Sequence, residues 1–121
     1  MAGTIVSDTL QDGAGNSTAT TNAIKGSAKA WIVHNGTSIL SSYNVSSITN
    51  PSSGRYLISF TTAMPTANYV TQISGADNSS YVGTLDNNTF TPTASQVQVA
   101  YINTSIVATN VDRGSVTIFS N

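Results

Sequence analysis

Few side chains in this 121-residue chain are able to perform acid–base or nucleophilic chemistry. The sequence has one histidine, His34, five aspartates, no glutamate and no cysteine. A Ser-His-Asp site around His34 would need a nucleophile held in a sharp turn, and no G-x-S-x-G elbow occurs. His34 instead precedes Asn35-Gly36, a dipeptide typical of a tight hairpin turn. The pattern favours a structural histidine at a strand end.

The five aspartates lie beside or within turns or loop-rich stretches: Asp8, Asp12, Asp77, Asp86 and Asp112. Hydrolysis by paired carboxylates would need two of them to converge, whereas aspartate at such positions usually bends or caps the backbone. The oxygen-rich runs at 77–78 and 86–88 would suit Ca²⁺, but their spacing matches no known calcium loop. The sequence therefore predicts no enzyme activity, no cofactor and no catalytic or metal site.

Low charge excludes further classes of function. Four basic and five acidic residues give a net charge of −1. Without clustered Lys or Arg, we expect neither a nucleic-acid footprint nor a basic membrane-surface helix. No run approaches the roughly 20 apolar residues of a transmembrane helix, and residues 1–13 have no signal-peptide pattern. Together with the lack of cysteine, this fits assembly in a reducing cytoplasm.

The composition predicts β-strands. The chain has 18 Thr, 10 Val and 10 Ile, whose branching at Cβ suits a pleated sheet, and only 4 Leu, 2 Lys, 2 Arg and 2 Met among the strong helix formers. Apolar residues alternate with polar ones and turn signals recur about every 8–12 residues. The expected fold is all-β: an antiparallel, jelly-roll-like β-sandwich of about eight to ten short strands with an extended N-terminal arm and no helix. The strands are expected at 28–34, 38–41, 43–48, 55–62, 68–74, 81–85, 89–91, 96–103 and 115–120.

Residues 1–26 differ from the rest, since small polar residues separate their few large aliphatic side chains. We expect this segment to be a separate arm, formed as a short hairpin or an extended strand, ahead of a β-sandwich domain at 27–121. A structural arm and a segment that attaches the chain to another protein are both consistent with the pattern. Ile5, Val6 and Leu10 are the candidate attachment residues.

Candidate binding residues come from the aromatic and amide side chains. Trp31, the one tryptophan, has apolar neighbours and is expected in the core or at a subunit interface rather than as a sugar-stacking platform. Tyr81 follows the polar stretch 75–80 and is the best candidate for an exposed contact, because tyrosine gives a large rigid contact area at low entropic cost. Asn78 and Asn87, in neighbouring loops, are the other candidate contacts with a partner or receptor.

Three stretches in this order resemble short tail-fibre-like virion proteins of tailed bacteriophages, especially phages of marine bacteria and cyanobacteria. They are GSAKAW at 26–31, SYNVSSIT at 42–49 and FTTAMPTANY at 60–69. The opening GTIVSDTL at 3–10 is also similar to the N-terminal segment of that family. The sequence departs from the family at Val33-His34, where a polar residue and an aromatic are usual, and it matches weakly over 75–113.

The resemblance implies a non-enzymatic virion structural protein: a tail-fibre-like, receptor-binding module, displayed on the particle as a homotrimer and assembled in the host cytoplasm. Its partners would be other tail or capsid proteins, through the arm at 1–26, and a host surface glycan or protein, through the display domain at 27–121. A capsid decoration protein, such as a head fibre or cement protein, is the alternative, and a free-standing carbohydrate-binding module is a third. Nucleic acid and membrane insertion are not expected.

Overall fold

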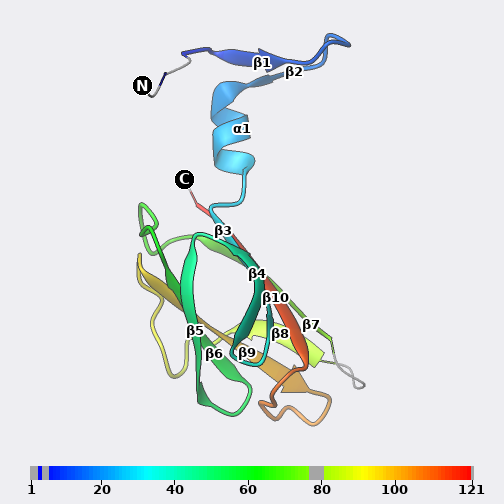
Figure 1. Ribbon diagram of the computed structural model, residues 1–121, viewed down its shortest axis with the longest axis vertical. Coiled ribbons are helices and arrows are strands. Elements are labelled where there is room, and N and C mark those ends of the chain that lie inside the picture. Colours follow the sequence, from blue (N-terminus) through cyan, green and yellow to red (C-terminus); the bar gives the residue numbers. More distant parts are fainter. Residues whose placement is uncertain (1–2, 4–5, 77–80, 121) are drawn as a thin grey trace.

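The computed structural model describes Gly3, residues 6–76 and residues 81–120. Two four-stranded antiparallel sheets pack face to face, which confirms the expected all-β sandwich (Figure 1). In the first sheet the strand order is β4 (Ser38–Tyr43), β3 (Ala30–Asn35), β10 (Arg113–Phe119) and β7 (Val70–Ala76). In the second it is β5 (Val45–Ser52), β6 (Arg55–Phe60), β9 (Gln96–Asn103) and β8 (Tyr81–Leu85).

The core lies between the two sheets and follows the period of two that a pleated strand imposes. In β6, Tyr56, Ile58 and Phe60 are buried while the residues between them are half-buried. In β10, Val116 and Ile118 face the same interior. The buried apolar cluster consists of Ala30, Ile32, Ile48, Tyr56, Ile58, Phe60, Met64, Val97, Val99, Tyr101, Val111, Val116 and Ile118.

Strand β3 corrects one expectation: Trp31 is not a core residue. Its core-facing residues are Ala30, Ile32 and His34, at 1%, 1% and 0% exposure, whereas Trp31 is half-buried on the opposite face. The size of Trp31 favours its own face as the core face, whereas the face that is buried carries a small residue, Ala30, and a polar one, His34. The second half of that expectation, a subunit interface, stays a prediction.

The two tight turns need glycine. Gly36 follows β3 at φ +53°, as the Asn35-Gly36 signal predicted, and Gly54 lies between β5 and β6 at φ +70°. A Cβ on Gly54 would also meet the Thr109 amide nitrogen at 2.2 Å. Gly54 is therefore required both by backbone conformation and by the close approach of the segment between β9 and β10.

The chain passes from the first sheet to the second at Asn44, which has φ +54°. Its Nδ2 donates hydrogen bonds to the carbonyls of Lys29 and Thr62, both at 3.0 Å, and its Oδ1 accepts from the Thr62 amide at 2.7 Å. Asparagine tolerates this left-handed conformation better than most residues. The corner explains why β4 extends to Tyr43 and β5 begins at Val45, rather than breaking at residue 42 as expected.

Ahead of the sandwich stand a hairpin and a helix (Figure 1). The hairpin pairs β1 (Thr9–Gln11) with β2 (Ser17–Ala19), and α1 (Thr20–Gly26) follows. Asp12 organises the hairpin turn, since its carboxylate accepts from the amides of Ala14 and Asn16, both at 2.9 Å. The expectation that the chain has no helix is therefore wrong at α1, and the strand expected at 89–91 is a turn and loop instead. No helix in the described part of the chain is both long and apolar enough to cross a bilayer.

Candidate functional site

His34 lies one residue before the end of β3 and is fully buried beside two tyrosines. Its ring centroid lies 4.9 Å from that of Tyr56 and 5.8 Å from that of Tyr101. Nδ1 lies 2.8 Å from the Gly36 carbonyl oxygen, which only accepts, so Nδ1 carries the proton. Nε2 is then the acceptor for the Tyr101 hydroxyl at 3.1 Å. Both ring nitrogens are committed to structural hydrogen bonds.

Burial governs the protonation of this cluster. It lowers the pKa of His34, because the charged imidazolium would lose its hydration, although the hydrogen bond to Gly36 works in the opposite direction. Burial also raises the pKa of Tyr101 far above its ordinary value, and that of Tyr56 in the same direction. The neutral forms of all three side chains are therefore favoured. The geometry is that of a packed polar cluster and does not assemble a Ser-His-Asp relay.

Asp86 makes a buried ion pair that the sequence did not reveal. Its Oδ2 lies 2.6 Å from the Arg55 Nε and accepts from the Gln98 Nε2 at 2.9 Å and the Thr89 hydroxyl at 2.7 Å. Burial of the carboxyl opposes ionisation, but these hydrogen bonds outweigh it and lower the pKa of Asp86 to about 2. The sequence favours a turn role for Asp86, with Ca²⁺ ligation as the alternative, and does not indicate an ion pair with Arg55. Its ion pair ties the segment after β8 to β6 and β9.

The described residues do not form a cluster of metal ligands at either of the two candidate Ca²⁺ sites, 77–78 and 86–88. No group of three or more His, Asp or Glu side chains gathers in residues 6–76 and 81–120. The Asp86 carboxylate is occupied by the contacts above, and Asp77 and Asn78 lie outside the described residues.

Of the three candidate contact residues, Asn78 lies outside the described residues, and the structure places Tyr81 and Asn87 apart. Tyr81 begins β8 opposite Asn103, is half-buried and packs against the core. Asn87 is exposed beyond the other end of β8. The strand between them is five residues long, a span of roughly 17 Å. Their role as contacts stays a prediction.

The candidate attachment residues lie in the arm. Val6 is 90% exposed and Leu10 on β1 is 47% exposed, and Ile5 lies outside the described residues. Ile24 of α1, which sequence reasoning did not single out for attachment, is 58% exposed. The arm therefore carries several solvent-exposed aliphatic side chains.

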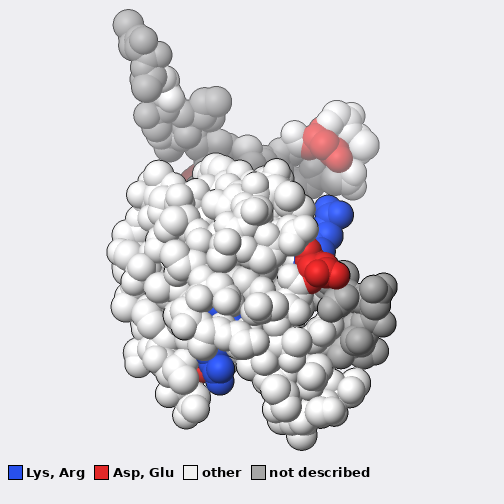
Figure 2. All heavy atoms as spheres, turned by 60° about the horizontal axis from the view of Figure 1, so that its bottom comes forward, with Lys and Arg blue, Asp and Glu red and all other residues white. Residues whose placement is uncertain are grey.

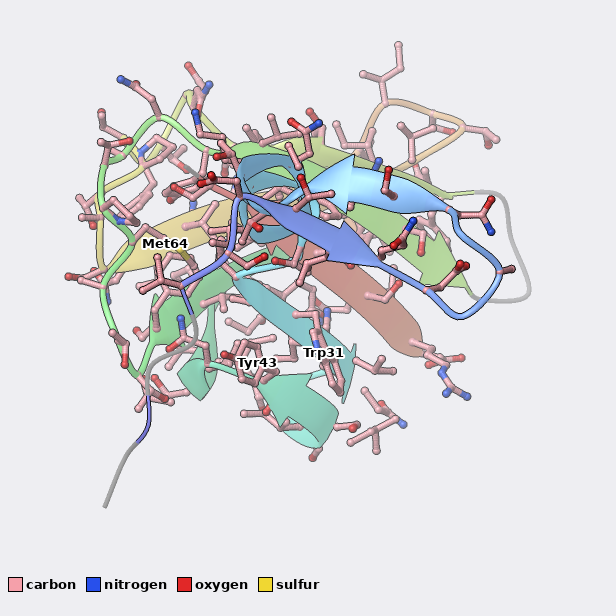
Figure 3. The ribbon with its side chains drawn as sticks, turned by 90° about the horizontal axis from the view of Figure 1, so that it is seen from above. Trp31, Tyr43 and Met64 are labelled. Atoms are coloured by element: carbon pink, nitrogen blue, oxygen red, sulfur yellow. The ribbon has the colours of Figure 1, made fainter. Side chains whose placement is uncertain are left out.

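An aromatic pair marks the outer face of the first sheet. Trp31 on β3 lies directly opposite Tyr43 on β4, and Figure 3 shows the two side by side. Tyr43 is 58% exposed, and it borders a groove of about 420 Å³ whose other side is the loop 61–65, including the buried Met64. Lys29, the one charged side chain lining this groove, donates hydrogen bonds to the Ile24 carbonyl and to the Ser27 hydroxyl.

A second pocket, of about 350 Å³, lies at the end of the sandwich remote from α1, where the β3–β4 and β5–β6 turns are found (Figure 1). We call it the far-end pocket. It is lined by Asn35, Gly36, Thr37, Asn50, Tyr56, Asn110, Val111 and Asp112. Sequence reasoning missed it, because its residues come from three segments separated by up to about 75 positions and no local motif joins them.

The surface around this end carries little charge. Figure 2, turned so that the end remote from α1 comes forward, shows mostly uncharged side chains with a few scattered Lys, Arg and Asp. The 18 Ser, 18 Thr and 12 Asn of the chain supply neutral hydrogen-bonding groups instead. Contacts at this surface would depend on hydrogen bonding and packing more than on long-range attraction.

Comparison of the chain with models of protein families, with curated proteins and with solved structures gives no match.

Proposed function

We propose that this chain is a non-enzymatic structural protein of a bacteriophage virion, a tail-fibre-like, receptor-binding module displayed on the particle surface. The sequence resemblance supplies the class of protein. One structural observation carries the assembly role: every residue of β1 and β2 is exposed, and α1 has no buried residue. In this proposal the arm attaches the chain to the virion and the sandwich is presented outward.

The arm needs a partner for physical reasons. Two three-residue strands and a seven-residue helix are each marginal in water without tertiary packing. Leu10 and Ile24 remain 47% and 58% exposed. Burying such a side chain fully contributes about 1.5–3 kcal/mol. Docking on another virion protein would supply the burial that the sandwich does not.

We further propose a homotrimer, with the outer face at Trp31 and Tyr43 as a subunit contact. Aromatic side chains are enriched at protein interfaces, and these two lie opposite each other on neighbouring strands with Tyr43 58% exposed. Strand β4, which carries Tyr43, is an edge strand of its sheet. Exposed sheet edges are normally covered or protected.

A capsid decoration protein is the second candidate. The observation that favours it is that the described residues after α1 form one sandwich rather than an elongated repeat. The arm would then bind a capsomer instead of the tail. Copy number per particle separates the two, since decoration requires hundreds of copies and a tail module requires few.

The experiment is to produce phage particles with the Leu10→Ser/Ile24→Ser variant. Both side chains are exposed in the isolated chain, so the sandwich should keep its melting temperature while incorporation falls by at least about tenfold. The matched control is Val70→Ser/Val82→Ser, whose residues are 63% and 69% exposed on the sandwich. Equal incorporation of the arm variant and the wild type would overturn attachment through the arm.

A further inference from the structure

The far-end pocket has side-chain amides whose orientation is fixed. The two hydrogens of the Asn50 Nδ2 are directed to the Ser52 carbonyl at 2.9 Å and the Arg55 carbonyl at 2.8 Å, and the Asn110 Oδ1 lies 3.3 Å from the same nitrogen. The Asn110 Oδ1 also accepts from the Gly54 amide at 2.7 Å. These bonds leave one acceptor, the Asn50 Oδ1, and one donor group, the Asn110 Nδ2, for a ligand.

Three more polar groups line the same pocket. The Asn35 carboxamide, the Thr37 hydroxyl and the Asp112 carboxylate make no hydrogen bond with the described residues, and all three residues are exposed. Together with Asn50 and Asn110 they place donors and acceptors around a volume of about 350 Å³. Small-molecule sites combine such a concave volume with a few convergent polar groups.

The walls of the pocket are held in place from beneath. The Val111 amide lies 3.4 Å from the buried Tyr56 hydroxyl, which accepts its hydrogen. The Gly36 carbonyl is fixed by the proton on the His34 Nδ1. The β5–β6 turn is fixed by the close approach of Gly54 to Thr109. A pocket that is already ordered loses little conformational entropy when it binds a ligand.

Charge decides among ligand classes. Asp112 is the one charged residue lining the pocket, and no Lys or Arg lines it. Phosphates and acidic sugars are disfavoured without a basic partner. One carboxylate is also a poor basis for Ca²⁺, which takes six to eight oxygen ligands. Sugar hydroxyls, which each donate and accept, match the alternating groups.

We propose that the far-end pocket binds a neutral carbohydrate, with Asn35, Thr37, Asn50, Asn110 and Asp112 as the hydrogen-bonding residues. The inference that this carbohydrate is the host receptor rests on the proposed function. The inference that the pocket binds a carbohydrate rests on the geometry of the pocket alone. The pocket lies at the end of the sandwich remote from α1 (Figure 1), where an attached arm would leave it accessible.

The test is a titration of the ¹⁵N-labelled full chain with neutral hexoses, N-acetylhexosamines and their short oligomers. We expect at least one to bind with a dissociation constant in the millimolar range or below, and to shift the Asn110 and Asn35 side-chain amide signals. Calcium chloride alone and glucuronic acid are the other arms. Three results would each overturn the proposal. One is the absence of a saturable shift with any neutral sugar up to about 50 mM. The others are tighter binding of glucuronic acid than of every neutral sugar, and the same signal shifts with calcium chloride alone.

Variants localise the site. Asn35→Ala/Thr37→Ala removes two exposed side chains that make no hydrogen bond with the described residues, and should weaken sugar binding by at least about tenfold at a nearly unchanged melting temperature. Asn88→Ala/Thr91→Ala makes the same changes elsewhere on the exposed surface and should bind as wild type. Equal binding by both variants would place the sugar outside this pocket. If the arm variant loses incorporation but no sugar binds to the wild type, this inference fails while the proposed function stands. If sugar binds but the arm variant incorporates as well as the wild type, attachment through the arm fails while this inference stands.

Discussion

The Nε2 atom of His34 accepts a hydrogen bond from the Tyr101 hydroxyl, 3.1 Å away across the interior of the sandwich. This bond joins β3 of the first sheet to β9 of the second. It requires an unprotonated Nε2, and burial supplies that condition by lowering the pKa of His34. This hydrogen bond in the core therefore joins the two sheets, and it makes the stability of their packing depend on pH.

Stability should fall as the pH drops below about 6.5, the ordinary pKa of histidine. The folded pKa of His34 is depressed, so the unfolded chain binds the proton first, and stability present above that pH is lost as the pH falls. Asp86, with a pKa of about 2, adds a second loss between about pH 4 and 2. Chemical denaturation from about pH 8 to about pH 2 measures both. His34→Gln should remove the first step, and a profile unchanged in that variant would contradict the assignment.

At high pH, the stability of the fold is limited by the ionisation of tyrosines that are fully or partly buried, such as Tyr69. Burial raises the pKa of Tyr69 to about 12. Its hydroxyl donates to the Gln96 carbonyl at 2.9 Å. The stability from a neutral Tyr69 is present below about pH 10 and is lost as the pH rises through its folded pKa. Stability should therefore be flat between about pH 7.5 and 9.5, and Tyr69→Phe should delay the alkaline loss, measured by the same denaturation series.

Gly114→Ala should destabilise the protein by about 1–3 kcal/mol, as overpacked cores do. A Cβ at Gly114 would lie 2.3 Å from the Tyr101 hydroxyl and 2.4 Å from the His34 Nε2. Gly26→Ala is the matched control, since nothing lies within 4 Å of the Cβ it would add. Thermal melts of the two variants give the comparison. Similar melting temperatures would show that the cluster has more room than these distances allow.

Asp86→Asn should cost about 1.5–3 kcal/mol, the range for hydrogen bonds to charged groups. The change removes the charge facing Arg55 while keeping the shape of the side chain. Asp112→Asn is the control, because Asp112 is exposed and has no ion pair with the described residues; it should stay within about 0.5 kcal/mol of wild type. Urea unfolding at pH 7 measures both, and equal effects would contradict a specific role for the buried pair.

Trp31→Ala should cost less than Ile32→Ala, although tryptophan is the larger residue. Ile32 is 1% exposed in the core, and truncating such a residue costs about 2–5 kcal/mol. Trp31 is half-buried on the outer face, where about 1–2 kcal/mol is expected from partial burial. Urea unfolding at a protein concentration low enough for both variants to be monomers compares them. The reverse order would restore Trp31 to the core.

Alternation predicted the strands best where one face is buried, and it failed at 89–91, which is a turn and loop. The stretch 55–62 predicted β6 and its core side chains Tyr56, Ile58 and Phe60. It failed at β3, where His34 occupies a core position that only the long-range partners Tyr101 and Gly114 make acceptable. Local sequence carries no record of such partners.

The helix α1 and the candidate sites were missed for related reasons. The sequence of α1 has no apolar stripe, and none of its residues is buried, so hydrophobic periodicity had nothing to detect. The Arg55–Asp86 pair spans 31 positions, and the far-end pocket draws on turns from three parts of the chain. Convergence of this kind follows from the strand order and cannot be read from spacing.

The central claim is that this chain is a component of a phage particle, and quantitative mass spectrometry of purified particles tests it most directly. The account predicts that peptides of the sandwich co-purify with infectious particles at a fixed stoichiometry that is a multiple of three. A small multiple assigns the chain to the tail, and hundreds of copies assign it to the head. Absence of the chain from particles that contain their full set of other structural proteins would contradict the account.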